Sequence, residues 1–360
     1  MSKTLLVLED GTIITGKSAG SKKDTFGEVV FNTSMTGYEE AFTDPSYAGQ
    51  ILLMTYPLIG NYGLHKKNFE SAKVQIRGLI LKEPYFFSHR GKNLLKFLQE
   101  NNVPCIWGID TRTLTLKIRQ YGTLKGAIIN RSSLDPKRLI KDIAHRPHPD
   151  TENLVSTVSC KKIILHENHR PYKIVLIDCG VKKSILKELK KFATVIQVPF
   201  DIDSKTIDSF KPSGIVISNG PGNPEHPEIK KTTIRTIQKL IGKYPIFGIC
   251  LGHQLLGIAL GLKTYKLKFG HRGSNHGVKE LSTGRVYITA QNHGYAIRYD
   301  HIREIRFDWI NVNDSTIEGL SHKHLPVFSV QFHPEAGPGP FDTKFLFRKF
   351  INYCAQAKRY

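Results

Sequence analysis

One turn of this chain reads Gly248-Ile249-Cys250-Leu251-Gly252-His253-Gln254 and joins an apolar run to a helical pattern. The run before it, residues 244–249, is typical of a short buried strand, and the residues after it place apolar side chains on one helical face. Glycines on both sides of Cys250 let a strand turn sharply into a helix without a steric clash. Such a turn holds the sulfur at the helix N-terminus, where free N–H groups and the helix dipole favour the thiolate. We therefore interpret Cys250 as a candidate nucleophile.

A second motif, Phe332-His333-Pro334-Glu335, ends an apolar run at residues 327–332 that is also typical of a buried strand. His333 and Glu335 are two positions apart, so in an extended chain their side chains leave on the same side. The carboxylate can then accept the imidazole N–H and fix the tautomer of the ring. Alone, this pair would rather indicate a surface ion pair. Together with the cysteine turn it predicts a hydrolytic triad of Cys250, His333 and Glu335.

These motifs resemble those of the class I (triad) glutamine amidotransferases, and the first half of the chain resembles the amino-terminal domain of the small subunit of carbamoyl phosphate synthetase. The matching segments are residues 31–39, 44–47, 55–61, 108–112, 218–224, 291–295 and 335–340. The triad motifs specify only the class, whereas the first-half motifs specify the synthetase. The chain departs from the pattern of the family at Gly277, where proline is usual, and at Gly337, where serine is usual.

The resemblance implies an activity and a role for each triad residue. The Cys250 thiolate would attack the side-chain amide carbon of L-glutamine, and His333 would pass a proton to the leaving ammonia and later activate water against a γ-glutamyl thioester. Glu335 would orient His333, and the N–H groups of Leu251 and Gly222 would stabilise the oxyanion. The implied glutamine pocket consists of Ser46, Gly220, Gly222, Leu251, Gln254, Asn292, Gly294 and Tyr295. Because Ser46 lies in the first domain, both domains would close this site.

The resemblance also implies a partner, because nothing in this chain resembles a nucleotide site. A separate large subunit would receive the ammonia through a protected passage and make carbamoyl phosphate from bicarbonate and ATP, for arginine and pyrimidine synthesis. ATP and magnesium are expected on that subunit, and neither a cofactor nor a metal is expected in this chain. This chain and the large subunit would form a heterodimer, and the resemblance leaves open whether such heterodimers assemble into a higher oligomer. Two alternatives also remain, a non-catalytic scaffold subunit and the amidotransferase subunit of another synthase, which should lack the first 150 residues or so.

Composition indicates a globular protein with two domains. The chain has 360 residues and a formal net charge of +21, but its lysines and arginines are spread along the whole length, so we expect no nucleic-acid partner. No apolar run approaches the roughly 20 residues of a membrane helix, and charged residues interrupt the N-terminus too early for a secretory signal. Five cysteines without a C-x-x-C pair fit a reducing compartment, which we expect to be the cytoplasm or, alternatively, the plastid stroma.

The predicted fold class is α/β in two parts. Residues 1–146 are expected to form a strand-rich mixed α/β domain, residues 147–171 a linker, and residues 172–360 an amidotransferase domain with a mainly parallel sheet flanked by helices. In the first domain, strands are expected at 5–8, 28–31, 51–54, 74–81 and 127–129, and helices at 93–100, 111–120 and 136–146. In the second, strands at 173–178, 194–199, 214–218 and 244–249 alternate with helices, which places the motifs at the carboxyl ends of the strands.

Three other patterns in the sequence resemble functional sites. Residues 11–18 match the P-loop expression, but their β-branched residues and the preceding Asp10-Gly11 favour a hairpin. Cys179 also ends a strand, yet no helix-opening glycine pattern surrounds it, so a buried structural thiol is expected. The pairs His271 with His276 and His322 with His324 lack cysteines at zinc-finger spacing, so no zinc site is expected.

Overall fold

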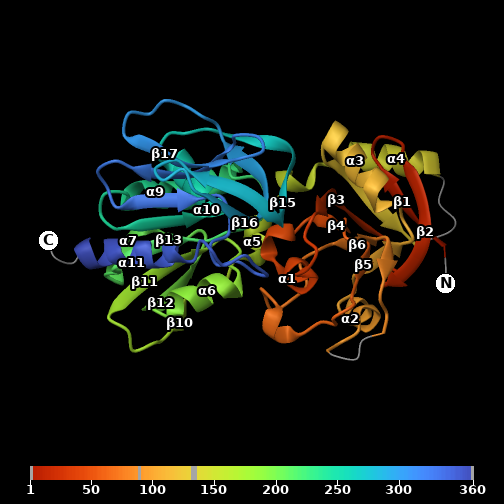
Figure 1. Cartoon of the computed structure of the whole chain (residues 1–360), viewed down its shortest axis with the longest axis horizontal. Helices are drawn as coiled ribbons and strands as arrows, with labels where there is room; N and C mark the ends of the chain where they lie inside the picture. The colour runs from red at the N-terminus through yellow and green to blue at the C-terminus, as the bar shows by residue number, and fades with distance from the viewer. Residues whose placement is uncertain (1–2, 88–90, 131–135, 358–360) are drawn as a thin grey trace. The chain divides into compact units, whose positions relative to one another are not determined.

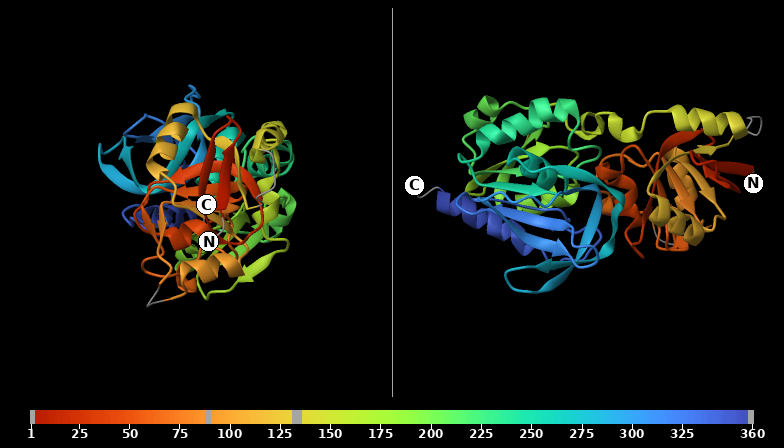
Figure 2. Two further views of the ribbon diagram at one scale, coloured as in Figure 1. Left: turned by 90° about the vertical axis from the view of Figure 1, so that its right-hand side faces the viewer. Right: turned by 90° about the horizontal axis from the view of Figure 1, so that it is seen from above.

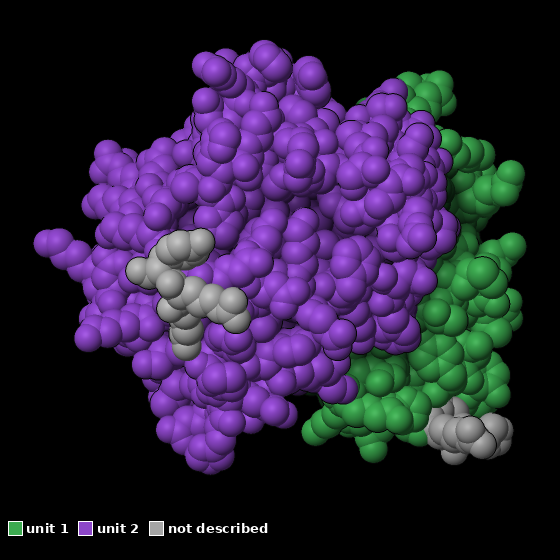
Figure 3. Space-filling model, turned by 60° about the vertical axis from the view of Figure 1, so that its left-hand side comes forward, with its two compact units in different colours: residues 1–152 green, residues 153–360 purple. Residues whose placement is uncertain are grey.

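The computed structural model describes residues 3–87, 91–130 and 136–357. The chain divides into two compact units, unit 1 (residues 1–152) and unit 2 (residues 153–360), which Figure 3 shows in different colours. The division falls inside the segment 147–171, where the sequence predicts a linker. Much of that segment is folded, because helix α5 (Leu154–Val158) and strand β10 (Ile164–His166) belong to unit 2.

Unit 1 is a closed barrel with the strand order β1-β2-β8-β6-β4-β3-β9. Its strands are β1 (Lys3–Leu8), β2 (Ile13–Gly20), β3 (Thr25–Asn32), β4 (Gln50–Met54), β6 (Gly78–Leu81), β8 (Pro104–Trp107) and β9 (Leu124–Ile129), with the short β5 (Leu58–Ile59) and β7 (Glu83–Pro84) apart from the barrel. Its helices are α1 (Tyr38–Thr43), α2 (Leu94–Glu100), α3 (Thr111–Tyr121) and α4 (Pro136–His145). Each strand and helix predicted for the first domain has a counterpart here, whereas α1 and β8 were not predicted.

The segment that matches the P-loop expression is a hairpin, as its residue types predict. Strand β2 begins at Ile13 and pairs antiparallel with β1, with Val7 opposite Ile13 and Leu6 opposite Ile14. Gly11 in the turn has a φ of 91°, which glycine adopts at little cost. The sequence therefore forms a strand where a phosphate-binding loop would have to open a helix.

Unit 2 contains a 10-stranded sheet with the order β10-β12-β11-β13-β14-β19-β18-β17-β15-β16. Strands β11 (Tyr172–Asp178), β12 (Ala193–Pro199), β13 (Gly214–Ile217), β14 (Ile246–Ile249) and β19 (Val327–Val330) pair in parallel. This confirms the parallel region that the Val/Ile-rich runs predict. The sheet continues through antiparallel strands that the sequence analysis did not assign: β18 (Ile317–His322), β17 (Ile305–Asn311), β15 (Thr264–Glu280) and β16 (Val286–Ile297) (Figure 1).

Helices cover both faces of the parallel strands, as the right-hand view of Figure 2 shows. The helices of unit 2 that position the core are α6 (Lys183–Lys190), α7 (Ser204–Ser209), α8 (Pro227–Ile229), α9 (Arg235–Leu240), α10 (Leu251–Ala259) and α11 (Phe345–Ala357). Alternate residues of β11 enter different clusters: Ile174 and Leu176 pack with α6 and α11, and Val175 and Ile177 with α7, α9 and α10. No helix among the described residues is long and apolar enough to cross a lipid bilayer.

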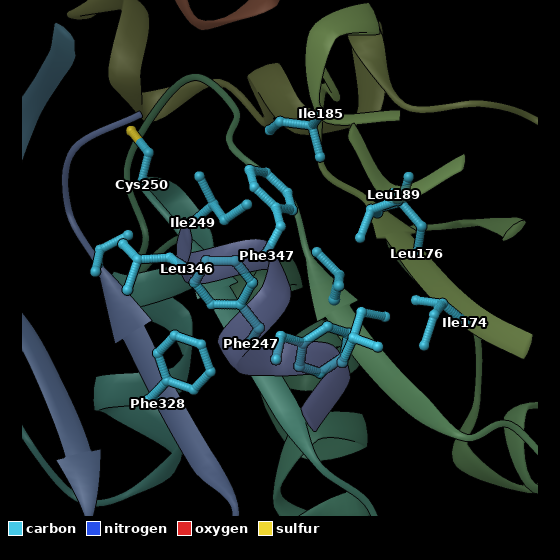
Figure 4. Close-up of a cluster of buried hydrophobic side chains, with 14 of the residues drawn as sticks. Ile174, Leu176, Ile185, Leu189, Phe247, Ile249, Cys250, Phe328, Leu346 and Phe347 are labelled. Atoms are coloured by element: carbon cyan, nitrogen blue, oxygen red, sulfur yellow. The ribbon is translucent and has the colours of Figure 1, made fainter. Parts of the chain in front are cut away.

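Figure 4 shows the cluster on the α6 and α11 side, where Phe247 stacks on Phe328 with ring centroids 4.5 Å apart. Ile249 lies at the end of the same strand, and the Cys250 sulfur lies beyond it, at the margin of the cluster. The packed core therefore fixes the strand end from which Cys250 projects.

Candidate active site

Cys250 occupies a strained turn between β14 and α10. Its φ is 55° and its ψ is −104°, a backbone conformation that L-residues rarely adopt and that is typical of functional strand-to-helix turns. Its N–H donates to the carbonyl of Val330 over 2.9 Å, which ties the turn to β19. A Cβ on Gly248 would lie 2.5 Å from the carbonyl oxygen of Gly252. The glycine on the strand side is therefore required for the close backbone approach that the sequence predicts.

The loop after β13 packs against the same turn. The N–H of Gly252 donates to the carbonyl of Ser218 over 3.0 Å, and a Cβ on Gly220 would lie 2.1 Å from the carbonyl oxygen of Cys179. Among the described residues, no hydrogen bond is made by the N–H groups of Leu251 and Gly222. Two backbone donors at this sheet edge are thus available to a ligand.

His333 and Glu335 form a buried pair, as their spacing predicts. Nδ1 of His333 lies 2.6 Å from Oε1 of Glu335, and the N–H of His333 donates to the carbonyl of Ala290 over 2.9 Å. Burial opposes the charged form of each group. The Glu335 charge nevertheless raises the pKa of the His333 ring, and Lys182 and His333 lower the pKa of the Glu335 carboxyl. The favoured state is an imidazolium held by a carboxylate.

The free nitrogen of His333 completes the arrangement with Cys250. Nε2 of His333 is buried and has no hydrogen-bond partner among the described residues. Cys250 is one of the groups that raise the pKa of His333, so the two side chains lie within electrostatic range. The sulfur itself lies 3.6 Å from the carbonyl oxygen of Asn292. The sulfur and the ring are thus neighbours, as proton transfer between them requires.

Lys182 is a further charged residue of this site, and the sequence analysis did not find it. Its Nζ lies 3.0 Å from Oε1 of Glu335 and donates to the carbonyl of Ala336 over 2.7 Å, and its side chain is only 3% exposed. A lysine is rarely buried without such a partner. Its position before α6, two residues after the strand-end segment Asp178-Cys179-Gly180, was the only signal in the sequence.

Comparison with known proteins finds matches along nearly the whole chain. The family model "Carbamoyl-phosphate synthase small chain, CPSase domain" matches residues 6–128, and "Glutamine amidotransferase class-I" matches residues 175–353. Small chains of carbamoyl phosphate synthase from Methanopyrus kandleri and Archaeoglobus fulgidus are 47% and 46% identical to this chain, covering 98% and 97% of it and 99% and 98% of their own lengths. The pyrimidine-specific small chain of Bacillus subtilis is 48% identical, with 97% of this chain and 95% of that one covered. The chain belongs to the carbamoyl phosphate synthase small-chain family.

In this small chain, the residues expected to bind glutamine lie on three elements of unit 2 and one of unit 1. Gln254 of α10 donates to the carbonyl of Tyr295 over 2.8 Å and to Oε1 of Gln331 over 3.0 Å, so α10 and β16 are tied together. Asn292, Gly294 and Tyr295 lie on β16, and Leu251 directly follows Cys250. A Cβ on Gly220 would lie 2.9 Å from the Leu251 side chain, whereas Gly222, in the same loop, lies beside Leu154. Ser46 lies in unit 1, where its N–H donates to Asp44, and its place in a shared pocket stays a prediction.

Two side chains near the small-chain site have structural roles. His253, in the same motif as Cys250, is buried against Ser329 with Nδ1 2.8 Å from the hydroxyl, and burial lowers its pKa to about 3. Cys179 is completely buried, and burial together with the Asp178 charge raises the pKa of its thiol well above the usual value. The prediction of a structural thiol at Cys179 fits both observations.

A polar cluster lies behind β16 of the small chain, and the sequence analysis missed it. The ligand atoms of His271, His293 and Glu318 lie within 4.8 Å of one another, close enough to hold a metal ion. Each of them already has a protein partner, however: Asp314 at 2.8 Å from His271, Gln291 at 3.0 Å from His293 and Asn311 at 3.0 Å from Glu318. We interpret the cluster as a buried hydrogen-bond network. His271 does lie beside His276, with ring centroids 5.2 Å apart, and the sheet adds His293 of β16 and Glu318 of β18, which sequence spacing does not indicate.

The two departures from the family pattern lie in different settings. Gly277 is in β15, where a Cβ would meet the Val312 side chain at 2.7 Å. Gly337 has a φ of 85°, a conformation in which a serine would be strained. Glycine therefore fits the observed backbone at both positions.

Replacement of Lys182 with methionine is expected to lower the free energy of unfolding by about 3 kcal/mol, because it leaves the buried Glu335 carboxylate without its lysine partner. Denaturation in urea measures this change. Lys183→Met is the matched control, because Lys183 is the adjacent lysine and is exposed, and it should stay within about 0.5 kcal/mol of the wild type. Equal stability of the two variants would contradict the prediction.

Stability should fall as the pH rises from about 6.5 to 9, in part because of His271. Burial disfavours its imidazolium, but hydrogen bonds to Asp314 and Glu318 outweigh this effect and raise the pKa to about 9. A group whose pKa is higher in the folded state than in the unfolded chain stabilises the fold. This stabilisation is complete at a pH below the unfolded pKa and is lost at a pH above the folded pKa. We expect a loss of about 1–2 kcal/mol, reduced by the partial exposure of Asp314.

The measurement is the urea midpoint at pH 6, 7.5 and 9 for the wild type and Asp314→Asn. Because the pKa of His333 is raised as well, only the difference between the two proteins isolates His271. The variant should lose less stability over this pH range than the wild type. An identical decline in both proteins would show that the ion pair of His271 with Asp314 contributes nothing.

Proposed function

We propose that this chain hydrolyses L-glutamine with the triad of Cys250, His333 and Glu335 and supplies the ammonia to a large, ATP-dependent subunit that makes carbamoyl phosphate. The observation that carries this proposal is the buried imidazole of His333, which is held by Glu335 at 2.6 Å while its other nitrogen is left unpartnered near a strained cysteine turn. Membership of the small-chain family supports the choice of glutamine as the substrate.

The first chemical step is attack of the Cys250 sulfur on the side-chain amide carbon of glutamine. A protonated His333 beside the sulfur stabilises the thiolate, and then donates its Nε2 proton to the nitrogen that leaves as ammonia. This forms a γ-glutamyl thioester, and the ring, now neutral, accepts a proton from water as the water attacks the thioester. Glutamate leaves and Cys250 returns to its starting state. Glu335 stays ionised throughout, because Lys182 lies 3.0 Å from the same oxygen that holds the ring.

The oxyanion of each tetrahedral intermediate would be held by the N–H groups of Leu251 and Gly222, which have no partner among the described residues. One such donor is typically worth about 3 kcal/mol of the barrier. Asn292, Gly294, Tyr295 and Gln254 would bind the rest of the substrate, joined by Gly220 and by Ser46 of unit 1. We assign no cofactor or metal to this chain. ATP and magnesium are proposed to act on the large subunit.

Reconstitution tests this function. The purified chain is mixed with the large subunit from the same organism, and carbamoyl phosphate formation from bicarbonate and MgATP is measured with glutamine or with ammonium chloride. The expected result is that the large subunit alone uses ammonium only, whereas the complex also uses glutamine and releases one glutamate per ammonia consumed. A complex that forms but releases no glutamate would support the scaffold alternative and overturn the proposal.

A further inference from the structure

Three exposed aliphatic side chains gather at the last strand of the unit 2 sheet. Val286 and Ile288 of β16 are 53% and 48% exposed, and Val312, just after β17, is 49% exposed. Strand β16 is the edge of the sheet, and Ile288 and Val286 pair with Gly277 and Lys279 of β15. Because residues two apart on a strand share a face, Val286 and Ile288 point to the same side. We call Val286, Ile288 and Val312 the edge patch.

The edge patch is continuous because Gly277 has no side chain. A Cβ on Gly277 would lie 2.7 Å from Cγ2 of Val312 and 3.6 Å from Cγ1 of Val286, so these side chains flank the bare backbone of the glycine. The N–H of Val312 donates to the carbonyl of Gly277 over 3.0 Å, which holds the two segments together. Tyr287 points to the opposite face, toward Trp309 and Phe345 with ring centroids 5.5 and 5.9 Å away. Tyr287 therefore packs toward the core, whereas Val286 and Ile288 face the solvent.

An exposed edge strand with uncharged, β-branched residues can pair with other chains and aggregate unless something covers it. Edge strands are usually protected by charged side chains or proline, and β16 carries neither between Val286 and Gln291. Apolar patches on one face, rimmed by polar residues, are typical of protein–protein contacts. These features point to a covering protein.

The charges around the edge patch indicate the chemistry of that protein. Lys279 and Arg285 are exposed beside Val286, and neither side chain makes an ion pair within the described part of the chain. The nearby carboxylates are occupied, since Glu280 accepts from the Thr283 hydroxyl and Asp314 binds His271. A second copy of this chain, with its net charge of +21, would bring like charges together. An acidic partner fits the rim better.

The strand that carries the edge patch also leads to the site where ammonia is released. Ala290 lies two residues beyond Ile288, and its carbonyl accepts a hydrogen bond from the N–H of His333. Asn292 lies two residues further along β16, and its carbonyl oxygen is 3.6 Å from the Cys250 sulfur. At about 3.3 Å per residue, the backbone distance from Ile288 to Asn292 is about 13 Å. A protein docked on the edge patch would thus lie next to the amidotransferase site.

We propose that the edge patch is a docking surface for the large, ATP-dependent subunit, which contributes apolar side chains to Val286, Ile288 and Val312 and carboxylates to Lys279 and Arg285. This assignment rests on the proposed function, because it takes the occupant from there. The surface itself is assigned from exposure, charge and continuity with the site.

Binding of the separately purified large subunit tests the proposal. The double variant Val286→Asp with Ile288→Asp should raise the Kd by at least about 100-fold, because it places two carboxylates in an apolar contact that also faces acidic groups. Lys279→Glu with Arg285→Glu should weaken binding about tenfold and reduce its dependence on salt. The matched control is Leu165→Asp on β10, at the other edge of the same sheet, where the leucine is 54% exposed. It should bind within about twofold of the wild type.

Three outcomes are informative. Circular dichroism and urea midpoints establish that each variant is folded, and a folded Val286→Asp, Ile288→Asp protein that binds as tightly as the wild type overturns the assignment. Light scattering of the chain alone tests whether a second copy of this chain covers the edge patch. If the wild type is a dimer and this double variant is a monomer, the assignment to the large subunit is overturned. Failure of the proposed function is distinguishable, since the wild-type complex would then form without hydrolysing glutamine.

Discussion

Replacement of Cys250 with serine is expected to lower glutamine-dependent carbamoyl phosphate synthesis by about 10⁴-fold or more, while synthesis from ammonium chloride continues at the wild-type rate. A serine hydroxyl occupies nearly the same space but is a far weaker nucleophile near neutral pH, and no other group at this turn can form the acyl intermediate. Loss of a triad nucleophile commonly costs several orders of magnitude in rate. Ammonium chloride bypasses the step proposed for Cys250, so synthesis from it should be unaffected.

Cys179→Ala is the matched control for this prediction. Cys179 also follows a strand of the parallel sheet, β11, but it is completely buried, and the pKa of its thiol is raised. The alanine variant should keep its glutamine-dependent rate within about threefold of the wild type, with a modest loss of stability from the small cavity. Full glutamine-dependent activity in Cys250→Ser, or its loss in Cys179→Ala alone, would move the nucleophile to another residue.

The parallel half of unit 2, the cysteine turn and the pair of His333 with Glu335 could be predicted because their signals are local. Apolar runs such as residues 173–178 and 327–332 form buried strands almost regardless of context, and a glycine-flanked cysteine between a strand and a helix permits few conformations. His333 and Glu335 are only two residues apart, and a turn at Pro334 and Glu335, closed by the hydrogen bond from the N–H of Ala336 to the carbonyl of His333, brings their side chains together. These predictions needed no knowledge of distant contacts.

The antiparallel half of unit 2 lacked such signals. Strand β15 runs from Thr264 to Glu280, yet its buried positions include His271 and Arg272, whose polarity hides the strand from a search for apolar alternation. Such a side chain can be buried because a partner from a distant segment satisfies it, as Asp314 in the turn between β17 and β18 does for His271. Lys182 was missed for the same reason, since its carboxylate partner Glu335 is remote in the sequence. Polar groups that pair over long sequence separations leave no local pattern.

Replacement of Gly252 with alanine is expected to lower the free energy of unfolding by about 4 kcal/mol or more, and to prevent folding if the loss exceeds the total stability. The new Cβ would lie 2.2 Å from the carbonyl oxygen of Ile217 and 2.7 Å from its carbonyl carbon. Both atoms belong to the backbone of β13, a central strand of the sheet, so neither can move without disturbing its pairing with β11 and β14. The hydrogen bond from the N–H of Gly252 to Ser218 would be strained as well.

Gly257→Ala, in the same helix, separates this clash from the general effect of a methyl group. Its Cβ would approach Cδ1 of Ile297 at 2.4 Å, which is nearly as close, but that atom is the end of a flexible side chain. Rotation of the isoleucine relieves the contact, and alanine gains about 1 kcal/mol of helix propensity over glycine. Gly257→Ala should therefore stay within about 1 kcal/mol of the wild type in urea denaturation, whereas Gly252→Ala should not. Equal midpoints for the two variants would mean that the β13 backbone yields, and that the tight approach of α10 to β13 is not what holds the cysteine turn in place.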